Sequence, residues 1–146
     1  MIIHLGADHA GFALKEHLKK FLEKKGYAVK DWGANKLIKT DDYPDYAAKV
    51  ARAVQKEGMG ILACGSAEGI CIAANKIKKI RAVPVWTVQS AKLSRQHNDA
   101  NVLCLSGWQL PKKTAEKIVL TWIKTPFSEE ARHKRRIQKI RRMECK

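Results

Sequence analysis

Residues 61–74 read ILACGSAEGICIAA, and this stretch indicates the class of fold. Its first three residues, Ile61 to Ala63, form a short apolar run of the kind found in a buried strand. A glycine-rich turn follows over 64–69, and the apolar residues after it fit a helix. A strand that passes through such a turn into a helix is the repeating unit of a protein with a parallel sheet.

The same alternation of strands and helices extends along the rest of the chain. Short apolar runs predict further strands at 2–5, 27–32, 82–86 and 102–105, and Pro84 favours an edge position or an irregularity in its strand. Helical spacing predicts helices around 14–22 (closed by Gly26), 46–54, 70–74, 90–97, 112–124 and 128–143. We therefore expect a three-layer, Rossmann-like α/β fold whose five mainly parallel strands are joined by right-handed crossovers.

Length and composition suit one globular domain over residues 1–146. The chain is 45% hydrophobic and 29% charged, which is ordinary for such a domain. Its basic C-terminal helix, about 128–143, has Ser128 and Glu129 where a cap and an acidic first turn are expected. No apolar stretch approaches the roughly 20 residues that span a bilayer, and the N-terminus does not fit a signal peptide. We expect a cytoplasmic protein with no membrane partner.

The formal net charge of +15 raises the question of a nucleic-acid partner. The densest basic stretch is RHKRRIQKIRR, at 132–142. An electrostatic footprint for RNA or DNA has this composition, but no nucleic-acid-binding motif accompanies it and no aromatic residues interleave with the basic ones. We interpret the stretch as solvated helix surface that includes one or two anion-binding arginines, and we expect no nucleic-acid partner.

The four cysteines are not spaced for metal binding. None forms a Cys-x-x-Cys pair, and no cysteine–histidine spacing matches a structural zinc site. Cys71 and Cys104 lie in apolar surroundings and are most simply small core residues. Cys64 differs because glycine and serine follow it directly. We expect no metal and no cofactor.

Three polar clusters concentrate the chemistry of the chain, at 6–11, 64–69 and 94–99. Together they hold a thiol, two imidazoles, a carboxylate and glycine-rich backbone. We place all three where strands turn into helices, and in an open α/β sheet such turns converge at the carboxyl ends of the strands, where ligands bind. The combination predicts proton-transfer chemistry on a small anionic substrate.

Each cluster also has a plain structural interpretation. Asp8 and His9 could cap the next helix, His97 could be an ordinary C-terminal helix residue, and Glu68 could be a first-turn acid. A single cysteine after a strand is more often a packing residue than a catalyst. However, successive backbone N–H groups at 64–69 would form an anion cradle and favour a thiolate. Only the joint occurrence of the clusters favours a catalytic interpretation.

Five motifs in order along the chain resemble type B ribose-5-phosphate isomerase, a family that also contains galactose-6-phosphate and allose-6-phosphate isomerases. They are Gly-x-Asp-His-x-Gly at 6–11, Thr-Asp-Asp-Tyr-Pro-Asp-Tyr at 40–46, Cys-Gly-Ser-x-x-Gly-x-x-Ile-Ala-Ala-Asn-Lys at 64–76, Ser-Arg-Gln-His-Asn-Asp-x-Asn at 94–101 and Arg-His-x-x-Arg at 132–136. The resemblance covers essentially the whole chain. It implies an aldose–ketose isomerase of the pentose phosphate pathway that needs no metal.

The resemblance also implies roles for individual residues. Cys64 matches the general base for the C2 proton, and Ser66 matches the residue that assists proton movement between O1 and O2. Asp8 and His97 match sugar-binding and ring-opening positions. The remaining implied contacts are those of backbone amides from Gly65, Ala67, Glu68 and Gly69 with the enediolate, of Tyr43 and Asn98 with the sugar, and of His9, Arg132 and Arg136 with the phosphate.

In the family, the histidine, asparagine and arginines reach a site whose cysteine belongs to the other subunit. The resemblance therefore implies a homodimer with shared active sites, with a tetramer as a further possibility. Two residues depart from the common pattern: Ala67 replaces a frequent glycine, and Glu68 adds a negative charge to the anion loop. Some members use a glutamate as base at the position of Ile70, so Glu68 does not inherit that role.

Two alternatives to a ribose-5-phosphate isomerase stay open. One is an isomerase of a 6-phosphohexose such as allose 6-phosphate, although Ala67 does not obviously provide room for the longer sugar. The other is a basic binding module without catalysis, against which Cys64 and His97 argue. Turnover of ribose 5-phosphate distinguishes these readings.

Overall fold

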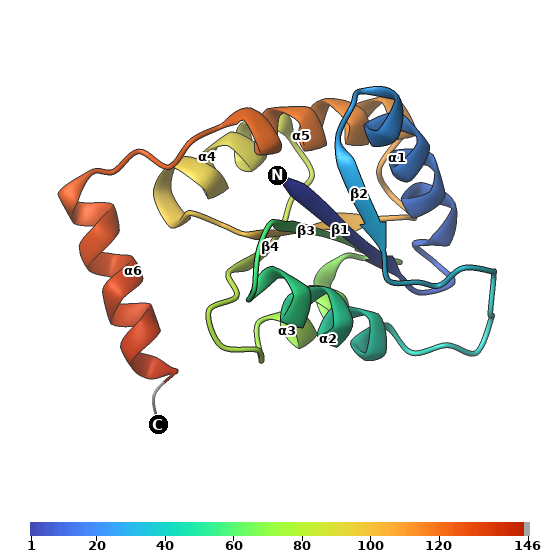
Figure 1. The fold of residues 1–146 in the computed structure, drawn as a ribbon, viewed down its shortest axis with the longest axis horizontal. Coiled ribbons are helices and arrows are strands. Elements are labelled where there is room, and N and C mark those ends of the chain that lie inside the picture. Colours follow the sequence, from blue (N-terminus) through green and yellow to red (C-terminus); the bar gives the residue numbers. More distant parts are fainter. Residues whose placement is uncertain (145–146) are drawn as a thin grey trace.

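The computed structural model describes residues 1–144 and contains one parallel sheet (Figure 1). Its strand order is β2-β1-β3-β5-β4, and every neighbouring pair is parallel. In chain order the strands are β1 (Ile2–Ala7), β2 (Ala28–Asp31), β3 (Met59–Cys64), β4 (Ala82–Pro84) and β5 (Val102–Ser106). The predicted α/β fold is confirmed.

The helices form two layers, one on each face of the sheet. Their bounds are α1 (Phe12–Lys24), α2 (Tyr43–Val54), α3 (Glu68–Ala74), α4 (Val88–Asn98), α5 (Lys112–Lys124) and α6 (Ala131–Met143). Helices α1, α4 and α5 lie on one face, and α2 and α3 lie on the other (Figure 1). Helix α6 stands beside the sandwich and packs against α4, burying His133 and Ile137.

Alternate residues of the central strands β3 and β5 supply two separate cores. Ile61 and Ala63 pack under α1 and α5, whereas Leu62 and Cys64 pack under α2 and α3. This division follows from the two-residue period of a strand, which sends successive side chains to opposite faces. Because both faces are covered, strands β3 and β5 are buried along their whole length.

Most predicted elements are confirmed, and the last helix needs a correction. Helix α5 has the predicted bounds, Gly26 follows α1 with a φ of +84°, and Pro84 ends an edge strand. The expected cap at Ser128 is wrong, because Glu129 adopts a left-handed φ of +59° that interrupts helical backbone. Helix α6 starts at Ala131, and the Ser128 hydroxyl instead lies 2.7 Å from Nδ1 of His133.

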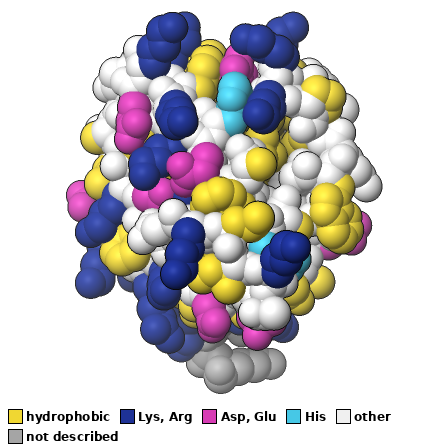
Figure 2. Space-filling view, turned by 90° about the vertical axis from the view of Figure 1, so that its right-hand side faces the viewer, with side chains coloured by type: hydrophobic (Ala, Val, Ile, Leu, Met, Phe, Trp, Pro, Cys, Tyr) yellow, Lys and Arg dark blue, Asp and Glu magenta, His cyan; other side chains and the backbone are white. Residues whose placement is uncertain are grey.

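Among residues 1–144, no helix has both the length and the apolar character that a membrane crossing requires. Basic side chains are spread among acidic and hydrophobic ones on the face that Figure 2 presents. On this face, the mixed pattern differs from the continuous basic stripe of a nucleic-acid-binding surface.

The buried His4, in β1, hydrogen-bonds to the segments that follow β2 and α2. Trp32 Nε1 donates to Nδ1 of His4 over 3.1 Å, and Nε2 of His4 lies 3.1 Å from the carbonyl oxygen of Glu57. Since Nδ1 accepts, Nε2 carries the proton and donates to the carbonyl, which defines a neutral imidazole. Burial lowers the pKa of His4 below its ordinary value of 6.5.

We predict that His4 makes the stability of the protein fall as the pH drops below about 6.5. The unfolded chain protonates this imidazole near that pH, whereas the folded chain resists protonation until a lower pH, so the unfolded state binds more protons in this window. One such group contributes a slope of at most about 1.4 kcal/mol per pH unit. Urea denaturation of wild type and His4→Gln between pH 5 and 8, about the range where histidine titrates, measures it. Equal slopes for the two proteins would contradict the assignment.

Candidate active site

The candidate site lies at the point where the strand order of the sheet reverses, between β1 and β3. From β1 the chain first moves outward to β2 and then returns to the other side of β1 to form β3. Ala7 pairs with Ala63, so Asp8 and Cys64 lie at the same level, at the carboxyl ends of two adjacent strands. The crevice beyond the carboxyl ends at such a reversal is the usual ligand site of an open α/β sheet.

A cavity of 310 Å³ occupies this crevice. Its walls come from the turns after β1, β3 and β5 and from the start of α2. The lining residues are Asp8, His9, Ala10, Tyr43, Cys64, Gly65, Ser66, Gly69 and Trp108. The structure thus brings Tyr43 together with the predicted residues of the first two clusters, except Ala67 and Glu68, which do not line the cavity. Among residues 1–144, no lysine or arginine lines the cavity.

Cys64 is the last residue of β3 and is only 4% exposed. Burial raises the pKa of its thiol above the ordinary value, and the nearby Asp8 carboxylate acts in the same direction. The backbone N–H groups of Ile70, Ala67 and Ser66 act in the opposite direction, which is the predicted cradle effect, but burial outweighs them. The single chain therefore holds Cys64 as a neutral thiol.

The loop after Cys64 presents backbone rather than side chains to the cavity. Ala67 adopts a left-handed φ of +73°, and its methyl group packs in the core under α2 and α3. It therefore leaves the cavity unobstructed while accepting a backbone conformation that glycine adopts more easily. The Glu68 side chain is exposed and does not line the cavity, as expected for a first-turn acid.

The turn after β1 supplies a buried carboxyl and a paired imidazole. Asp8 accepts a hydrogen bond from the Gly11 N–H at 3.0 Å, and burial raises the pKa of this carboxyl. His9 lies 2.8 Å from Asp41 through Nδ1, and this hydrogen bond raises the pKa of the imidazole. His9 is exposed, and its cationic form is favoured next to the cavity.

The third cluster, 94–99, lies at the opposite edge of the sheet. Helix α4 runs antiparallel to the strands and ends at Asn98, just before β5 begins at Val102. Cys64 pairs with Ser106, at the far end of β5, roughly 13 Å along that strand. The expected convergence of all three clusters at the carboxyl edge is therefore wrong, because 94–99 is a turn from helix into strand.

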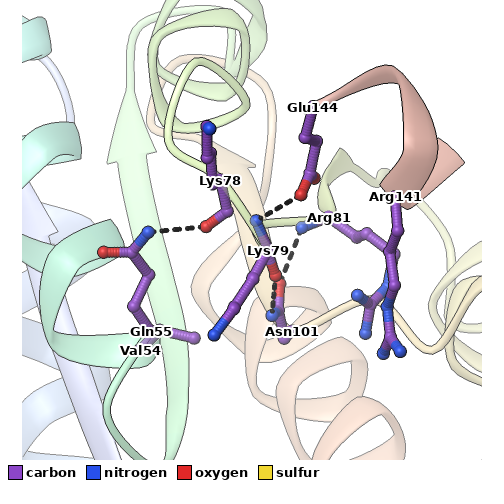
Figure 3. Close-up of a pocket in the computed structure, with 8 residues that line it drawn as sticks. All are labelled: Val54, Gln55, Lys78, Lys79, Arg81, Asn101, Arg141 and Glu144. Atoms are coloured by element: carbon purple, nitrogen blue, oxygen red, sulfur yellow. Dashed lines mark hydrogen bonds between the residues drawn. The ribbon is translucent and has the colours of Figure 1, made fainter. Parts of the chain in front are cut away.

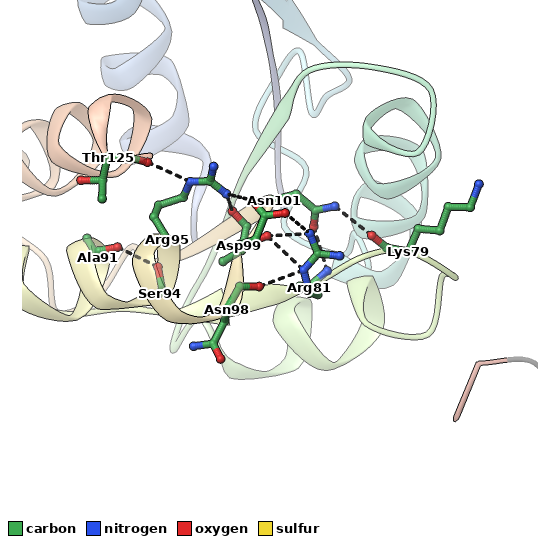
Figure 4. A network of polar contacts seen from close by, with 10 residues as sticks. Lys79, Arg81, Ala91, Ser94, Arg95, Asn98, Asp99, Asn101 and Thr125 are labelled. Carbon is green, nitrogen blue, oxygen red and sulfur yellow. Dashed lines mark hydrogen bonds and ion pairs between the residues drawn. The ribbon is translucent and has the colours of Figure 1, made fainter. Parts of the chain in front are cut away.

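An ion-pair network fixes the end of α4 (Figure 4). Asp99, at a left-handed φ of +44°, accepts from Arg81 and from Arg95, each at 2.8 Å. Arg81 also donates to the backbone carbonyl of Asn98 at 2.9 Å, and Arg95 to that of Ala100 at 2.6 Å. The bond to Asn98 occupies the carbonyl group of the last residue of the helix, which has no partner within it, and the bond to Ala100 fixes the turn that follows.

His97, Asn98, Arg132 and Arg136 form a second group of predicted site residues, carried by α4 and α6. The His97 and His133 rings lie 4.4 Å apart between centroids, and Arg132 donates to Glu130 at 2.8 Å. Asn98, Arg132 and Arg136 are exposed. This group does not line the cavity that contains Cys64 in the same chain.

A larger cavity, of 530 Å³, lies near the amino ends of β4 and β5 (Figure 3). Gln55, Lys79 and Asn101 are among its lining residues, and their polar groups bond to the chain itself. Gln55 donates to the Lys78 carbonyl at 2.7 Å, and Asn101 donates to that of Lys79 at 2.8 Å. Of the described residues, no cysteine or histidine lines it, so it offers less for proton transfer than the Cys64 cavity does.

Two residues of the Cys64 cavity and its rim were not singled out from the sequence. Asp41 is in the motif at 40–46, but the pattern does not show that it pairs with His9. Trp108 follows β5, and its place after a strand end was the available signal. Cys71 and Cys104 are buried, as predicted, and Cys145 lies outside the described residues. Within residues 1–144, no group of three histidine, cysteine or acidic side chains is arranged to hold a metal ion.

Comparisons with known proteins agree with this architecture. The profile of the Ribose/Galactose Isomerase family matches residues 3–140. The chain is 43% identical over 145 residues to ribose-5-phosphate isomerase B of Escherichia coli. The aligned region covers 97% of this chain and 95% of that protein. A protein of Mycoplasma genitalium named probable ribose-5-phosphate isomerase B has the same identity and coverage.

Solved structures are equally similar. Ribose-5-phosphate isomerase B of Clostridium thermocellum superposes with a TM-score of 0.96 at 42% identity, covering 99% of this chain and 98% of that one. The Mycoplasma genitalium enzyme with bound ribulose-5-phosphate gives 0.95 at 42% identity, covering 99% and 97%. Because the family profile matches residues 3–140 and relatives at 42–43% identity cover 97–99% of it, the chain belongs to the ribose/galactose isomerase family.

Proposed function

We propose that this protein interconverts ribose 5-phosphate and ribulose 5-phosphate through an enediolate. The observation that carries the proposal is the Cys64 thiol at the wall of a 310 Å³ cavity, beside Asp8 and facing a loop of backbone N–H groups. A member of the same family has been solved with bound ribulose-5-phosphate. Aldose–ketose isomerisation needs a base at carbon and stabilisation of a developing oxyanion, and this loop offers both.

The chemistry is a proton transfer between neighbouring carbons. Cys64, as thiolate, removes the proton from C2 of the open-chain aldose, and the same proton returns to C1 to give the ketose. Backbone N–H groups of Gly65, Ala67, Glu68 and Gly69 stabilise the enediolate oxygens, and Ser66 assists the proton that moves between O1 and O2. No net oxidation occurs, so the step calls for no redox cofactor.

The remaining residues open and hold the sugar. Asp8 and His97 exchange protons with the ring oxygen and the anomeric hydroxyl during ring opening. Tyr43 and Asn98 bind the sugar hydroxyls. His9, Arg132 and Arg136 bind the phosphate, with the pairing of His9 to Asp41 favouring its cationic form. Binding energy from the remote phosphate then holds C2 against the thiolate.

We further propose that two copies of the chain share each active site. The phosphate of the substrate is an anion, and no lysine or arginine among the described residues lines the Cys64 cavity. His97, Asn98, Arg132 and Arg136 lie at the opposite edge of the sheet. In a two-fold dimer, that group from one copy covers the cavity of the other. A tetramer made from two such dimers would keep every site.

Cys64 must lose its proton before it can act as the base. Burial favours the neutral thiol in a single chain, whereas the base must be a thiolate. Cations brought close to a thiol favour its ionised form. His9, whose pairing with Asp41 favours its cationic form, supplies positive charge next to the same cavity.

Two broader proposals complete this function. Residues 1–146 act as one isomerase domain, because the two groups of site residues draw on the turns after β1 and β3 as well as on the C-terminal helix. The protein works in the cytoplasm, because free cysteines at 64, 71 and 104 suit a reducing compartment.

We predict that Cys64→Ala lowers kcat for ribose 5-phosphate by about a hundredfold or more, the usual result of removing a general base, with little change in KM. The reason is that the anion cradle is backbone and survives the substitution. Cys71→Ala is the matched control: it removes a buried thiol from α3, outside the cavity, and should keep kcat near the wild-type value. A Cys64→Ala enzyme that keeps more than about a tenth of kcat would refute the role of the base.

We predict that Arg136→Ala raises KM for ribose 5-phosphate by roughly 10- to 150-fold, since a charge-assisted phosphate contact is worth about 1.5–3 kcal/mol. Part of the loss reaches kcat because the phosphate contact also positions C2. The control is Arg135→Ala, an exposed neighbour about 100° around the same helix, which should leave KM unchanged. If Arg136→Ala left the kinetics unchanged, Arg136 would not bind the phosphate and would be ordinary solvated surface.

We predict that inactive Cys64→Ala and His97→Ala proteins restore activity when they are mixed and allowed to exchange. About half of the dimers become mixed, and each mixed dimer has one site with neither substitution, so activity approaches about a quarter of wild type. Native mass spectrometry confirms the exchange, and ribose 5-phosphate turnover measures the recovery. A mixture that exchanges but stays inactive would mean that each site is built from one chain.

A further inference from the structure

Two aromatic rings lie against glycines of the loop that follows Cys64. A methyl group placed on Gly65 would meet the six-membered ring of Trp108 at 2.5–2.7 Å, and one placed on Gly69 would meet Tyr43 at 2.7–3.1 Å. Both distances are too short for a real side chain, so only glycine lets the rings rest on the loop backbone. Both rings also line the cavity. The cavity is therefore bounded by an aromatic ring at each end of the loop.

Backbone contacts fix the position of Trp108 relative to Cys64. The N–H of Gly107 donates to the Cys64 carbonyl at 2.8 Å, and the N–H of Trp108 donates to that of Gly65 at 3.3 Å. The Ser106 hydroxyl donates to the same Gly65 carbonyl at 2.6 Å. The turn after β5 is thus hydrogen-bonded to Cys64 and Gly65. These bonds fix the backbone of Trp108, and the indole ring takes no part in them.

The indole is nevertheless 74% exposed. A large apolar ring this exposed, on a fixed turn, leaves most of its surface available to another group. Its neighbours in the cavity are polar: a carboxyl, an imidazole and a thiol. A sugar chain has hydroxyl groups that such polar residues bind, and C–H groups that an aromatic face contacts. The cavity presents both kinds of surface.

We propose that Trp108 is a substrate-binding residue whose indole contacts the C–H groups of the sugar phosphate and holds its carbon chain against Cys64. This inference rests on the proposed isomerase function and adds a residue that none of the five sequence motifs contains. Tyr43 bounds the other end of the loop. The contact is with carbon rather than with the phosphate, because the indole carries no charge.

The test compares Trp108→Ala and Trp108→Phe with wild type, using ribose 5-phosphate as substrate and inorganic phosphate as a competitive inhibitor. Trp108→Ala should lower kcat/KM by about tenfold, the scale of an aromatic contact, and leave the inhibition constant of inorganic phosphate within about twofold. Trp108→Phe should keep most of the activity because an aromatic ring remains. In a Cys64→Ala background, ribose 5-phosphate should also quench the fluorescence of Trp108 but not that of the Trp108→Phe protein.

Three results would overturn the inference. Unchanged kcat/KM in Trp108→Ala would mean that the indole does not touch the substrate. Equal weakening of ribose 5-phosphate and inorganic phosphate would mean that the ring only supports the loop. A Trp108→Ala protein that no longer forms the dimer in native mass spectrometry would mean that Trp108 belongs to a subunit interface. Failure of the proposed function is distinct, because the wild-type protein itself would then not turn over ribose 5-phosphate.

Discussion

The parallel pairing of β1 with β3 is the constraint on which the site depends. Ala7 opposite Ala63 brings Asp8 and Cys64 to the same level at the carboxyl edge of the sheet. A shift of this register by one residue would turn Cys64 to the other face of the sheet. The pairing is held by burial on both sides, since neighbouring residues of β3 alternate between two cores. The turn after β5 then closes on the same loop through bonds to Cys64 and Gly65.

Burial that fixes the geometry also opposes the chemistry. A thiol inside the sheet edge is well placed, but the same desolvation favours its neutral form, and Asp8 adds to the effect. Backbone N–H groups compensate only in part. The described residues bring no lysine or arginine to the cavity, while His97, Arg132 and Arg136 gather at the opposite edge. The proposed site, shared between two copies, would bring the buried thiol of one chain together with the arginines of the other that bind the phosphate.

The order of elements could be predicted from the sequence because apolar runs and glycine turns are local signals. Helix α5 and the residues after β3 are examples, and the motifs around Cys64 identify the chemistry of that loop. The placement of 94–99 at the carboxyl ends was wrong although the predicted helix at 90–97 and strand at 102–105 already put this cluster before a strand rather than after one. The predicted cap at Ser128 was wrong because the left-handed backbone of Glu129 interrupts the helix there. Asp41 and Trp108 depend on contacts between distant segments, which composition does not encode.

The most direct test of the shared site is a crystal structure of the protein with bound ribulose 5-phosphate. The account predicts that C1 and C2 of the sugar lie beside the Cys64 sulfur of one copy, with backbone N–H groups of 65–69 facing O1 and O2. It further predicts that the phosphate contacts Arg132 and Arg136 of a second copy. A sugar whose carbons and phosphate are held by Cys64, Arg132 and Arg136 of the same chain would contradict it.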